Sequence, residues 1–221
     1  IHLVSAVPSL ETFNNIKNKK YNHTKLINRY SESPLPETKV INLQEAELKK
    51  DHFITKETID LVNKYLEKKE QVLFFLNRRG YAPFLICKNC GYKHLCPNCS
   101  IYLTYHKSIN KLICHHCGNK VKKDRSCSTS KNLCEFRMYG PGVEKIYEEL
   151  KVIFLKKKIE IFSSDFLYKK GKKESILKKI EKNEIDILIG TQLISKGFNF
   201  PKLNCIVVVD ADFSGMGYDL R

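Results

Sequence analysis

Cys87-Lys-Asn-Cys90, Cys96-Pro-Asn-Cys99 and Cys114-His-His-Cys117 form the stretch of sequence that decides the organisation of this 221-residue chain. Each is a C-x-x-C pair, and together with Cys127 and Cys134 they hold eight of the nine cysteines. Two thiolates three positions apart on a tight turn can both reach one tetrahedral Zn²⁺ ion, at Zn–S distances of about 2.3 Å. The alternative is a set of disulfides, which need an oxidising compartment, and the chain opens with no signal peptide. We therefore favour metal.

The second and third pairs complete one zinc site by themselves, which we call the inner site. Cys96, Cys99, Cys114 and Cys117 follow the spacing C-x2-C-x14-C-x2-C and supply four thiolates. The two histidines between Cys114 and Cys117 are spare candidate ligands, although histidines flanked by ligating cysteines are more often solvated or packed.

An outer site needs a fourth pair to join Cys87 and Cys90, and that pair would begin at Cys127. The position where its second cysteine is expected holds Ser130, and a hydroxyl is a poor zinc ligand beside thiolates. Cys134, four residues further on, can take its place through a longer loop. The sequence thus predicts an outer site made of Cys87, Cys90, Cys127 and Cys134.

The composition restricts the class of protein. No apolar run approaches the eighteen or so residues of a membrane-spanning helix, so that we expect a soluble protein without membrane contact. The cysteines, interpreted as metal ligands, predict an intracellular, cytoplasmic protein. The net charge of +15 indicates a polyanionic partner such as DNA. Lys greatly outnumbers Arg, whereas base recognition favours Arg, so the charge predicts phosphate contacts without sequence preference. An A+T-rich genome, which encodes many Lys, Asn and Ile residues, is the alternative explanation.

Outside the cysteine-rich stretch, strands and helices alternate. Val72-Leu-Phe-Phe-Leu76 is an unbroken apolar run, typical of a strand buried on both faces of a parallel sheet. Further strands are predicted within residues 1–10 and at 39–43, 159–162, 185–189 and 204–210, and helices after the caps Ser9 and Thr55 and at 142–155 and 171–182. This order predicts an α/β fold with a doubly wound parallel sheet, into which the cysteine-rich module is inserted.

A possible phosphate-binding turn follows one of these strands. Ile189-Gly190-Thr191-Gln192 comes directly after apolar residues, and Lys196-Gly197 lies shortly beyond. In open α/β sheets, ligands bind at the C-terminal ends of the strands, where a Gly-Thr turn lets the backbone approach a phosphate. A glycine-led turn with an exposed lysine explains the same residues equally well. The chain contains no G-x-x-x-x-G-K-[ST] phosphate loop and no catalytic triad, so that we assign no catalytic residue.

Several stretches, taken in order, resemble one family. They are Ser5-Ala-Val-Pro-Ser-Leu-Glu11, residues 72–83, the cysteine-rich pairs, Gly140-Pro-Gly-Val-Glu144 and residues 187–201. They resemble helicase motif III, the strand before a zinc insertion, that insertion, the start of the second motor lobe and motif V of the PriA (primosomal protein N′) family of superfamily 2 DNA helicases. Val7 stands where the family's motif III has threonine, and Ser130 stands where it has a zinc cysteine.

The resemblance implies a RecA-like second helicase lobe with an insertion for two Zn²⁺ ions, in an ATP-dependent 3′→5′ DNA helicase of replication restart and primosome assembly. The residues that would contact DNA phosphates and transmit the nucleotide state are Gly190, Thr191, Gln192, Lys196 and Gly197. The implied partners are forked or single-stranded DNA, primosome proteins and single-stranded DNA-binding protein. ATP and Mg²⁺ belong to the intact family enzyme. This chain lacks the phosphate loop, the acidic box and motif VI, so that we expect no ATP hydrolysis by it alone.

The resemblance also divides the chain. Residues 1–13 correspond to the end of the first helicase lobe, 14–38 to a linker, 39–84 and 135–221 to the second lobe, and 85–134 to the zinc-binding insertion. The sequence has no clear starting or stopping signal, so that we expect the middle part of a longer protein. Two alternatives stay open: a stand-alone zinc-containing module that binds single-stranded DNA or primosome proteins, and a non-functional remnant of a split helicase gene.

Overall fold

The computed structural model describes residues 2–5, 8–27, 34–49, 52–76, 84–123, 134–164, 166–167, 171–195 and 198–211. Contacts divide the chain into two compact units, one made of Ile1–Asn42 with Asp212–Arg221 and one made of Leu43–Ala211. The second unit contains the predicted sheet and the cysteine-rich module, and the two units are described separately.

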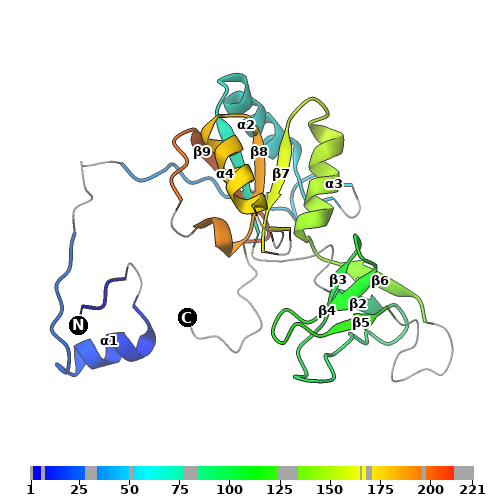
Figure 1. Ribbon diagram of the computed structural model, residues 1–221, viewed down its shortest axis with the longest axis horizontal. Coiled ribbons are helices and arrows are strands. Elements are labelled where there is room, and N and C mark those ends of the chain that lie inside the picture. Colours follow the sequence, from blue (N-terminus) through cyan, green and yellow to red (C-terminus); the bar gives the residue numbers. More distant parts are fainter. Residues whose placement is uncertain are drawn as a thin grey trace. The chain divides into compact units, whose positions relative to one another are not determined.

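A four-stranded parallel sheet lies at the centre of the second unit (Figure 1). Its strands are β1 Gln71–Phe75, β7 Ile159–Phe162, β8 Ile187–Gly190 and β9 Leu203–Val208, in the spatial order β7-β8-β1-β9. β8 lies between β7 and β1, and its last residue, Gly190, is opposite both Phe75 and Phe162. The predicted α/β class with a parallel sheet is confirmed.

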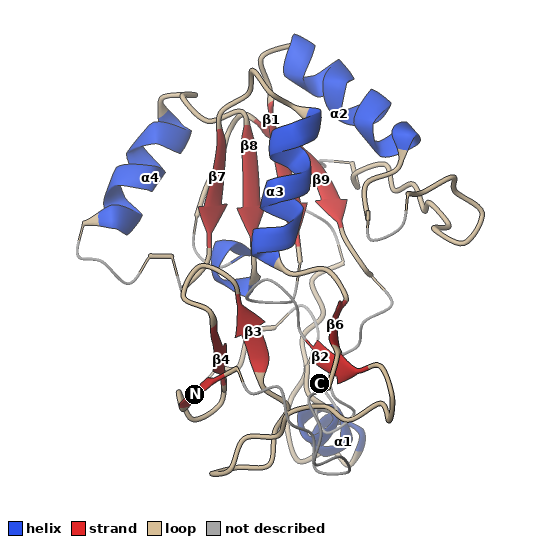
Figure 2. Cartoon of the chain, turned by 90° about the vertical axis from the view of Figure 1, so that its right-hand side faces the viewer, coloured by secondary structure: helices blue, strands red, loops and turns tan. Residues whose placement is uncertain are grey.

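Helices cover both faces of this sheet, and Figure 2 shows α3 in front of it. The helices are α2 Lys56–Glu67, α3 Val143–Ile153 and α4 Lys172–Glu181. Successive residues of a strand point to opposite faces, so that Val72 and Phe74 of β1 pack in the core formed with α2 and α3, whereas Leu73 packs with α4. This is the predicted doubly wound arrangement. Among the described residues, no helix has the length and apolar character that crossing a bilayer requires.

A buried carboxylate ties the segment before α2 to α3. Glu149 of α3 accepts the backbone N–H of Phe53 at 3.1 Å and that of Ile54 at 3.0 Å. The next residue, Thr55, caps α2 as predicted, because its Oγ1 accepts the N–H of Thr58 at 3.1 Å. These bonds fix the point at which α2 begins against the sheet.

The cysteine-rich module lies between β1 and α3 in the sequence and consists of two small antiparallel sheets (Figure 2). One sheet joins β2 Phe84–Cys87 to β6 Phe136–Tyr139, and the other joins β3 Thr104–His106, β4 Lys111–Ile113 and β5 Lys120–Lys122. Leu85, Leu103 and Leu112 pack with Cys96 and Cys114 in its core. Strands this short bury few apolar side chains, and the cysteines therefore make up part of the core.

The first unit contains α1 Leu10–Lys17, which is capped as predicted by Ser9, whose Oγ accepts the N–H of Thr12 at 3.3 Å. The strands predicted within residues 1–10 and at 39–43 are wrong, because the described residues of both segments form no strand. A strand needs a neighbouring strand and a surface to bury one of its faces. Val4 is 93% exposed and Val40 is 88% exposed, so neither segment has such a surface.

Candidate metal centre

The three C-x-x-C pairs share one backbone turn. In each pair, the N–H of the residue four positions after the first cysteine donates to that cysteine's carbonyl at 2.9 Å. The donors are Gly91, Ser100 and Gly118, and their φ angles are 73°, 56° and 76°. This left-handed conformation suits glycine and is strained for Ser100. All three pairs therefore have the same tight turn, including the pair Cys87–Cys90 of the predicted outer site.

The four sulfurs of the predicted inner site lie together. The Sγ atoms of Cys96, Cys99, Cys114 and Cys117 are all within 4.8 Å of one another. Cys96 and Cys117 are 3.5 Å apart, Cys99 and Cys114 are 3.4 Å apart, and Cys99 and Cys117 are 3.8 Å apart. Four thiolates at about 2.3 Å from one Zn²⁺ ion stand about 3.8 Å from each other, so the donor set fits a tetrahedral zinc ion.

The surroundings of these sulfurs shift the thiol pKa values in opposite directions. Burial raises the pKa of the Cys96 thiol, but hydrogen bonds from the backbone of Asn98, the Cys117 thiol and the backbone of Cys99 outweigh it and bring the pKa to about 6. The Cys114 thiol, together with burial, raises the pKa of Cys99 to about 12. Backbone N–H groups thus favour the thiolate at Cys96, and the thiolate is the form that binds metal.

The predicted outer site is described only in part. Cys87 and Cys134 are both buried and belong to one cluster with Tyr92 and Phe136, whereas Cys90 is exposed. Within the part of the chain that the structure describes, these three cysteines do not join a group of three close metal donors. Cys127 and Ser130 lie outside the described residues, so the outer site stays a prediction.

A histidine pair joins the metal loop to the first turn of α3. His115, which the sequence suggested as a spare ligand, has its Nε2 2.9 Å from Nε2 of His106. The Nδ1 of His106, a residue 3% exposed, lies 3.3 Å from Oε1 of Glu144 in α3. Ser108 also donates its backbone N–H to Glu144 at 3.3 Å. Sequence reasoning missed His106 and this bridge, because no spacing rule brings β3, the Cys114–Cys117 loop and α3 together.

The predicted phosphate-binding turn lies at the C-terminal edge of the sheet. Gly190 ends β8, and a Cβ atom there would lie 2.8 Å from the side chain of Ile194, so packing alone requires glycine. Thr191 is buried, and Gln192 begins a short 3₁₀ helix that ends at Ser195. Lys196 and Gly197 lie outside the described residues. The contact of these residues with phosphate stays a prediction.

The same edge holds a buried hydroxyl that sequence reasoning did not single out. Ser163 follows β7, is fully buried, and its Oγ has no hydrogen-bond partner among the described residues. By the register of β7 and β8, it comes directly after the residue that lies opposite Gly190. A buried hydroxyl without a partner among the described residues is uncommon.

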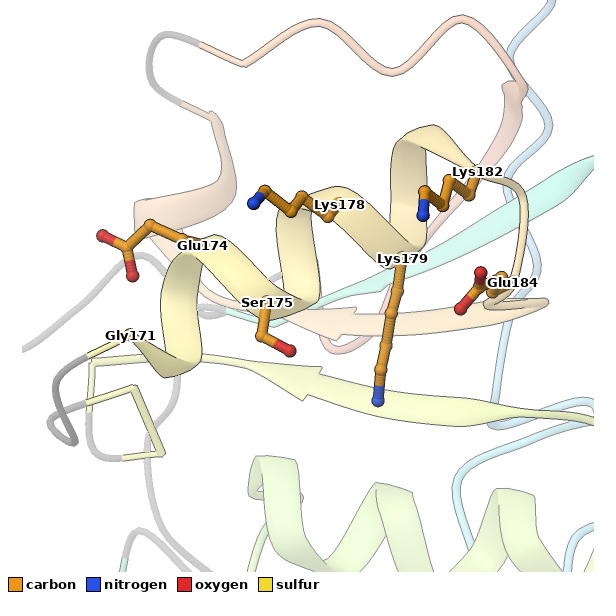
Figure 3. A pocket seen from close by; sticks show the side chains of 7 residues that line it. All are labelled: Gly171, Glu174, Ser175, Lys178, Lys179, Lys182 and Glu184. Atoms are coloured by element: carbon orange, nitrogen blue, oxygen red, sulfur yellow. The ribbon is translucent and has the colours of Figure 1, made fainter.

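A hollow of about 380 Å³ opens beside α4 (Figure 3). Its charged walls are made of Glu174, Lys178, Lys179, Lys182 and Glu184. Lys179 points toward β7, where its Nζ lies 4.0 Å from Oε1 of Glu160. Three lysines and two glutamates line this hollow, with no nucleophile and base in contact, as on a solvated helix face and unlike a catalytic site.

Comparison with protein families and curated proteins gives two family matches and a set of related proteins. Residues 96–122 match the PriA DNA helicase Cys-rich region domain, and residues 127–220 match the helicase conserved C-terminal domain. The chain is 43% identical to the replication restart protein PriA of Rickettsia typhi over 221 residues, and 37% identical to that of Haemophilus influenzae over 217 residues. It covers 34% of the first protein and 29% of the second, and thus spans about a third of the length of these relatives.

Proposed function

Because this chain belongs to the PriA family of DNA helicases, we propose that it forms the second RecA-like motor lobe and zinc insertion of an ATP-dependent 3′→5′ DNA helicase that acts in replication restart and primosome assembly. Residues 39–84 and 135–221 would form the lobe, 85–134 the insertion, 1–13 the end of the first lobe and 14–38 a linker. The observation that carries the proposal is the coincidence of 43% identity along the whole chain with a four-cysteine cluster inside the matched cysteine-rich region.

In this proposal the inner four cysteines hold one structural Zn²⁺ ion, and Cys87, Cys90, Cys127 and Cys134 hold a second. The shared turn of the three C-x-x-C pairs supports the second site, since the backbone at Cys87–Cys90 has the same conformation as in the two inner pairs. Cys134 is buried beside Cys87, which supports its role as the zinc ligand in place of the cysteine that is missing at position 130. A structural zinc ion would supply folding energy to the module and no step of the chemistry.

The motor function would belong to the edge of the sheet where β7 and β8 end. There the turn that begins at Gly190 would contact DNA phosphates, together with Lys196 and Gly197. Superfamily 2 motors hold ATP and Mg²⁺ between two lobes, and the phosphate-loop Lys and Mg²⁺ carboxylates would come from the part of the protein outside this chain. The bridge from His106 to Glu144 supports a module that moves together with the lobe, because it fastens the module to α3.

A second candidate function is that the zinc module itself binds single-stranded DNA or a primosome protein. The observation that favours it is the module's own apolar core, formed by residues of β2, β3 and β4 around two cysteines. The two candidates are compatible, because a module fastened to a motor lobe can also touch the strand that the motor moves.

An assay of ATP hydrolysis tests whether the nucleotide-binding residues come from outside this chain. The purified chain should show no DNA-stimulated ATP hydrolysis, and hydrolysis should appear when separately produced parts of a PriA protein that carry the phosphate loop, the acidic box and motif VI are added. A Lys196→Ala variant should lose the reconstituted activity, since it removes the cation of the proposed phosphate turn. Hydrolysis by the chain alone that survives repeated purification and is lost in Lys196→Ala would contradict the proposal.

A further inference from the structure

One face of the cysteine-rich module presents aromatic rings and cations side by side. In the antiparallel pair of β2 and β6, Phe84 is opposite Tyr139 and Ile86 is opposite Arg137. Residues directly opposite each other in such a pair share a face of the sheet. Leu85, on the other face, is buried in the core of the module. The face therefore consists of Phe84, Ile86, Arg137 and Tyr139.

Two further residues extend this face. Lys93 forms an isolated antiparallel bridge with Ile86, and its Nζ lies 5.0 Å from the ring centroid of Phe84 and 5.3 Å from that of Tyr102. The rings of Phe84 and Tyr102 meet edge to face, with centroids 5.8 Å apart. We call the six residues Phe84, Ile86, Lys93, Tyr102, Arg137 and Tyr139 the aromatic face.

The exposure of Tyr139 separates it from most aromatic residues of the chain. Tyr139 is 61% exposed, whereas Phe74 and Phe162 in the parallel sheet are fully buried. A large ring that is this exposed can offer a π face to a ligand. Phe84 and Tyr102 are half-buried, and contacts with Lys93 hold both of them.

The charge of the module decides which ligand suits this face. Between Phe84 and Tyr139 the sequence holds ten Lys and Arg residues, and its two acidic residues are Asp124 and Glu135. Surfaces that bind single-stranded nucleic acid combine a basic track for the phosphates with aromatic rings on which bases stack. The centre of a protein-binding surface is depleted in Lys, whereas here Nζ of Lys93 lies over the rings of both Phe84 and Tyr102.

We propose that the aromatic face binds single-stranded DNA, with a base stacked on Tyr139 and the adjacent phosphates held by Lys93 and Arg137. The site would be independent of the turn at Gly190 and would recognise the strand without preference for a base, because every base has a π face. This proposal deepens the proposed function and rests on it, since it names where the zinc module would touch the strand that the motor lobe moves.

A single fluorophore tests the stacking directly. The chain contains no Trp, so a Tyr139→Trp variant carries one tryptophan at the proposed contact. Its emission should be quenched in a saturable way by an oligothymidylate of about 16 nucleotides, the upper range of one small binding fold. A Tyr21→Trp variant is the matched control, because Tyr21 is 46% exposed and lies outside the module. Its emission should stay unchanged.

Affinity measurements separate stacking from general apolar contact. In fluorescence anisotropy at low salt, Tyr139→Leu should weaken oligothymidylate binding about tenfold, the size of one lost stack. Tyr139→Phe should bind as the unchanged chain does, since it keeps the π face, and Tyr21→Leu should have no effect. Zinc content, measured on each variant, should be the same in all of them and excludes loss of the module's fold as the cause.

The outcomes distinguish this proposal from the function on which it rests. Oligothymidylate that binds without quenching Tyr139→Trp, and equally well to Tyr139→Leu, would place the DNA elsewhere on the chain. The aromatic face would then be left for a protein partner, and the inference would be wrong while the proposed function stands. Absence of any DNA binding by the unchanged chain would overturn both.

Discussion

The four-stranded parallel sheet and the cysteine-rich module are built on different sources of stability. The sheet buries continuous apolar strands on two faces, with residues such as Phe74, Ile187 and Leu188 almost entirely shielded from water. The module has strands of three or four residues, and two of its fully buried core positions are cysteines of the inner site. The comparison teaches that one part of the chain should fold through apolar burial and the other through its metal.

Removal of the metal should have the largest effect and should affect the module alone. A Cys114→Ser variant should lose the inner zinc ion, and the module should unfold, because metal-binding energy in such modules is largely folding energy. Hydrogen exchange should show loss of protection in β3 to β5 and retained protection in β1 and β8. If the module keeps its protection in the zinc-free variant, the claim that it folds through its metal is wrong. Zinc analysis of the same sample provides the control.

Loss of a large side chain in the sheet should destabilise the sheet and leave the cysteine-rich module folded. Phe74→Ala should lower the free energy of unfolding of the lobe by about 3–5 kcal/mol, since it leaves a cavity in a core with little freedom to collapse. Val152→Ala is the control, because this α3 residue is 72% exposed and its loss should change stability by less than about 0.5 kcal/mol. Urea unfolding measures both, and the zinc content of Phe74→Ala should equal that of the unchanged chain.

The buried carboxylate of α3 should matter more than its exposed neighbour. Glu149→Gln should lower the free energy of unfolding by about 2 kcal/mol, because it weakens the hydrogen bonds to the N–H groups of Phe53 and Ile54 in a buried setting. Glu148, which pairs with Lys107 at 2.7 Å on the surface, is the matched control, and Glu148→Gln should cost less than about 1 kcal/mol. Equal effects of the two substitutions in urea unfolding would contradict the assigned role of Glu149.

The smallest effect is expected at the helix cap. Thr55→Ala should lower the free energy of unfolding by about 1 kcal/mol, because the N–H of Thr58 loses its acceptor. Thr55→Ser keeps an oxygen in the same place and should restore most of that stability. If alanine and serine at this position unfold at the same urea concentration, the cap contributes nothing.

The parts of the fold that the sequence predicted correctly are those with a local signal. The apolar run at Val72–Leu76 indicated a strand buried on both faces, and the repeated C-x-x-C spacing was enough to group the inner four cysteines. Thr55 and Ser9 were identified as caps because a cap needs only one side chain and the next turn of helix. These features depend on neighbours within a few residues, or on a spacing that one metal ion imposes.

The features that were missed depend on residues far apart in the chain. His106 meets Glu144 only because α3 packs beside β3, and Phe84 meets Tyr139 only because β2 pairs with β6 across the whole module. The strands predicted at the N-terminus and at 39–43 failed for the related reason that an apolar stretch forms a strand only beside another strand. No pattern in a single sequence fixes such pairings.

The measurement that tests the account most directly is DNA unwinding by a chimeric helicase. The matching third of Rickettsia typhi PriA would be replaced by this chain, and a Cys99→Ala version of the chimera would serve as the control. The account predicts that the chimera unwinds a forked DNA in the presence of ATP, and that the control, without its inner zinc ion, does not. A chimera that folds and binds zinc but leaves the fork unopened would contradict the claim that this chain is a working PriA-type motor lobe.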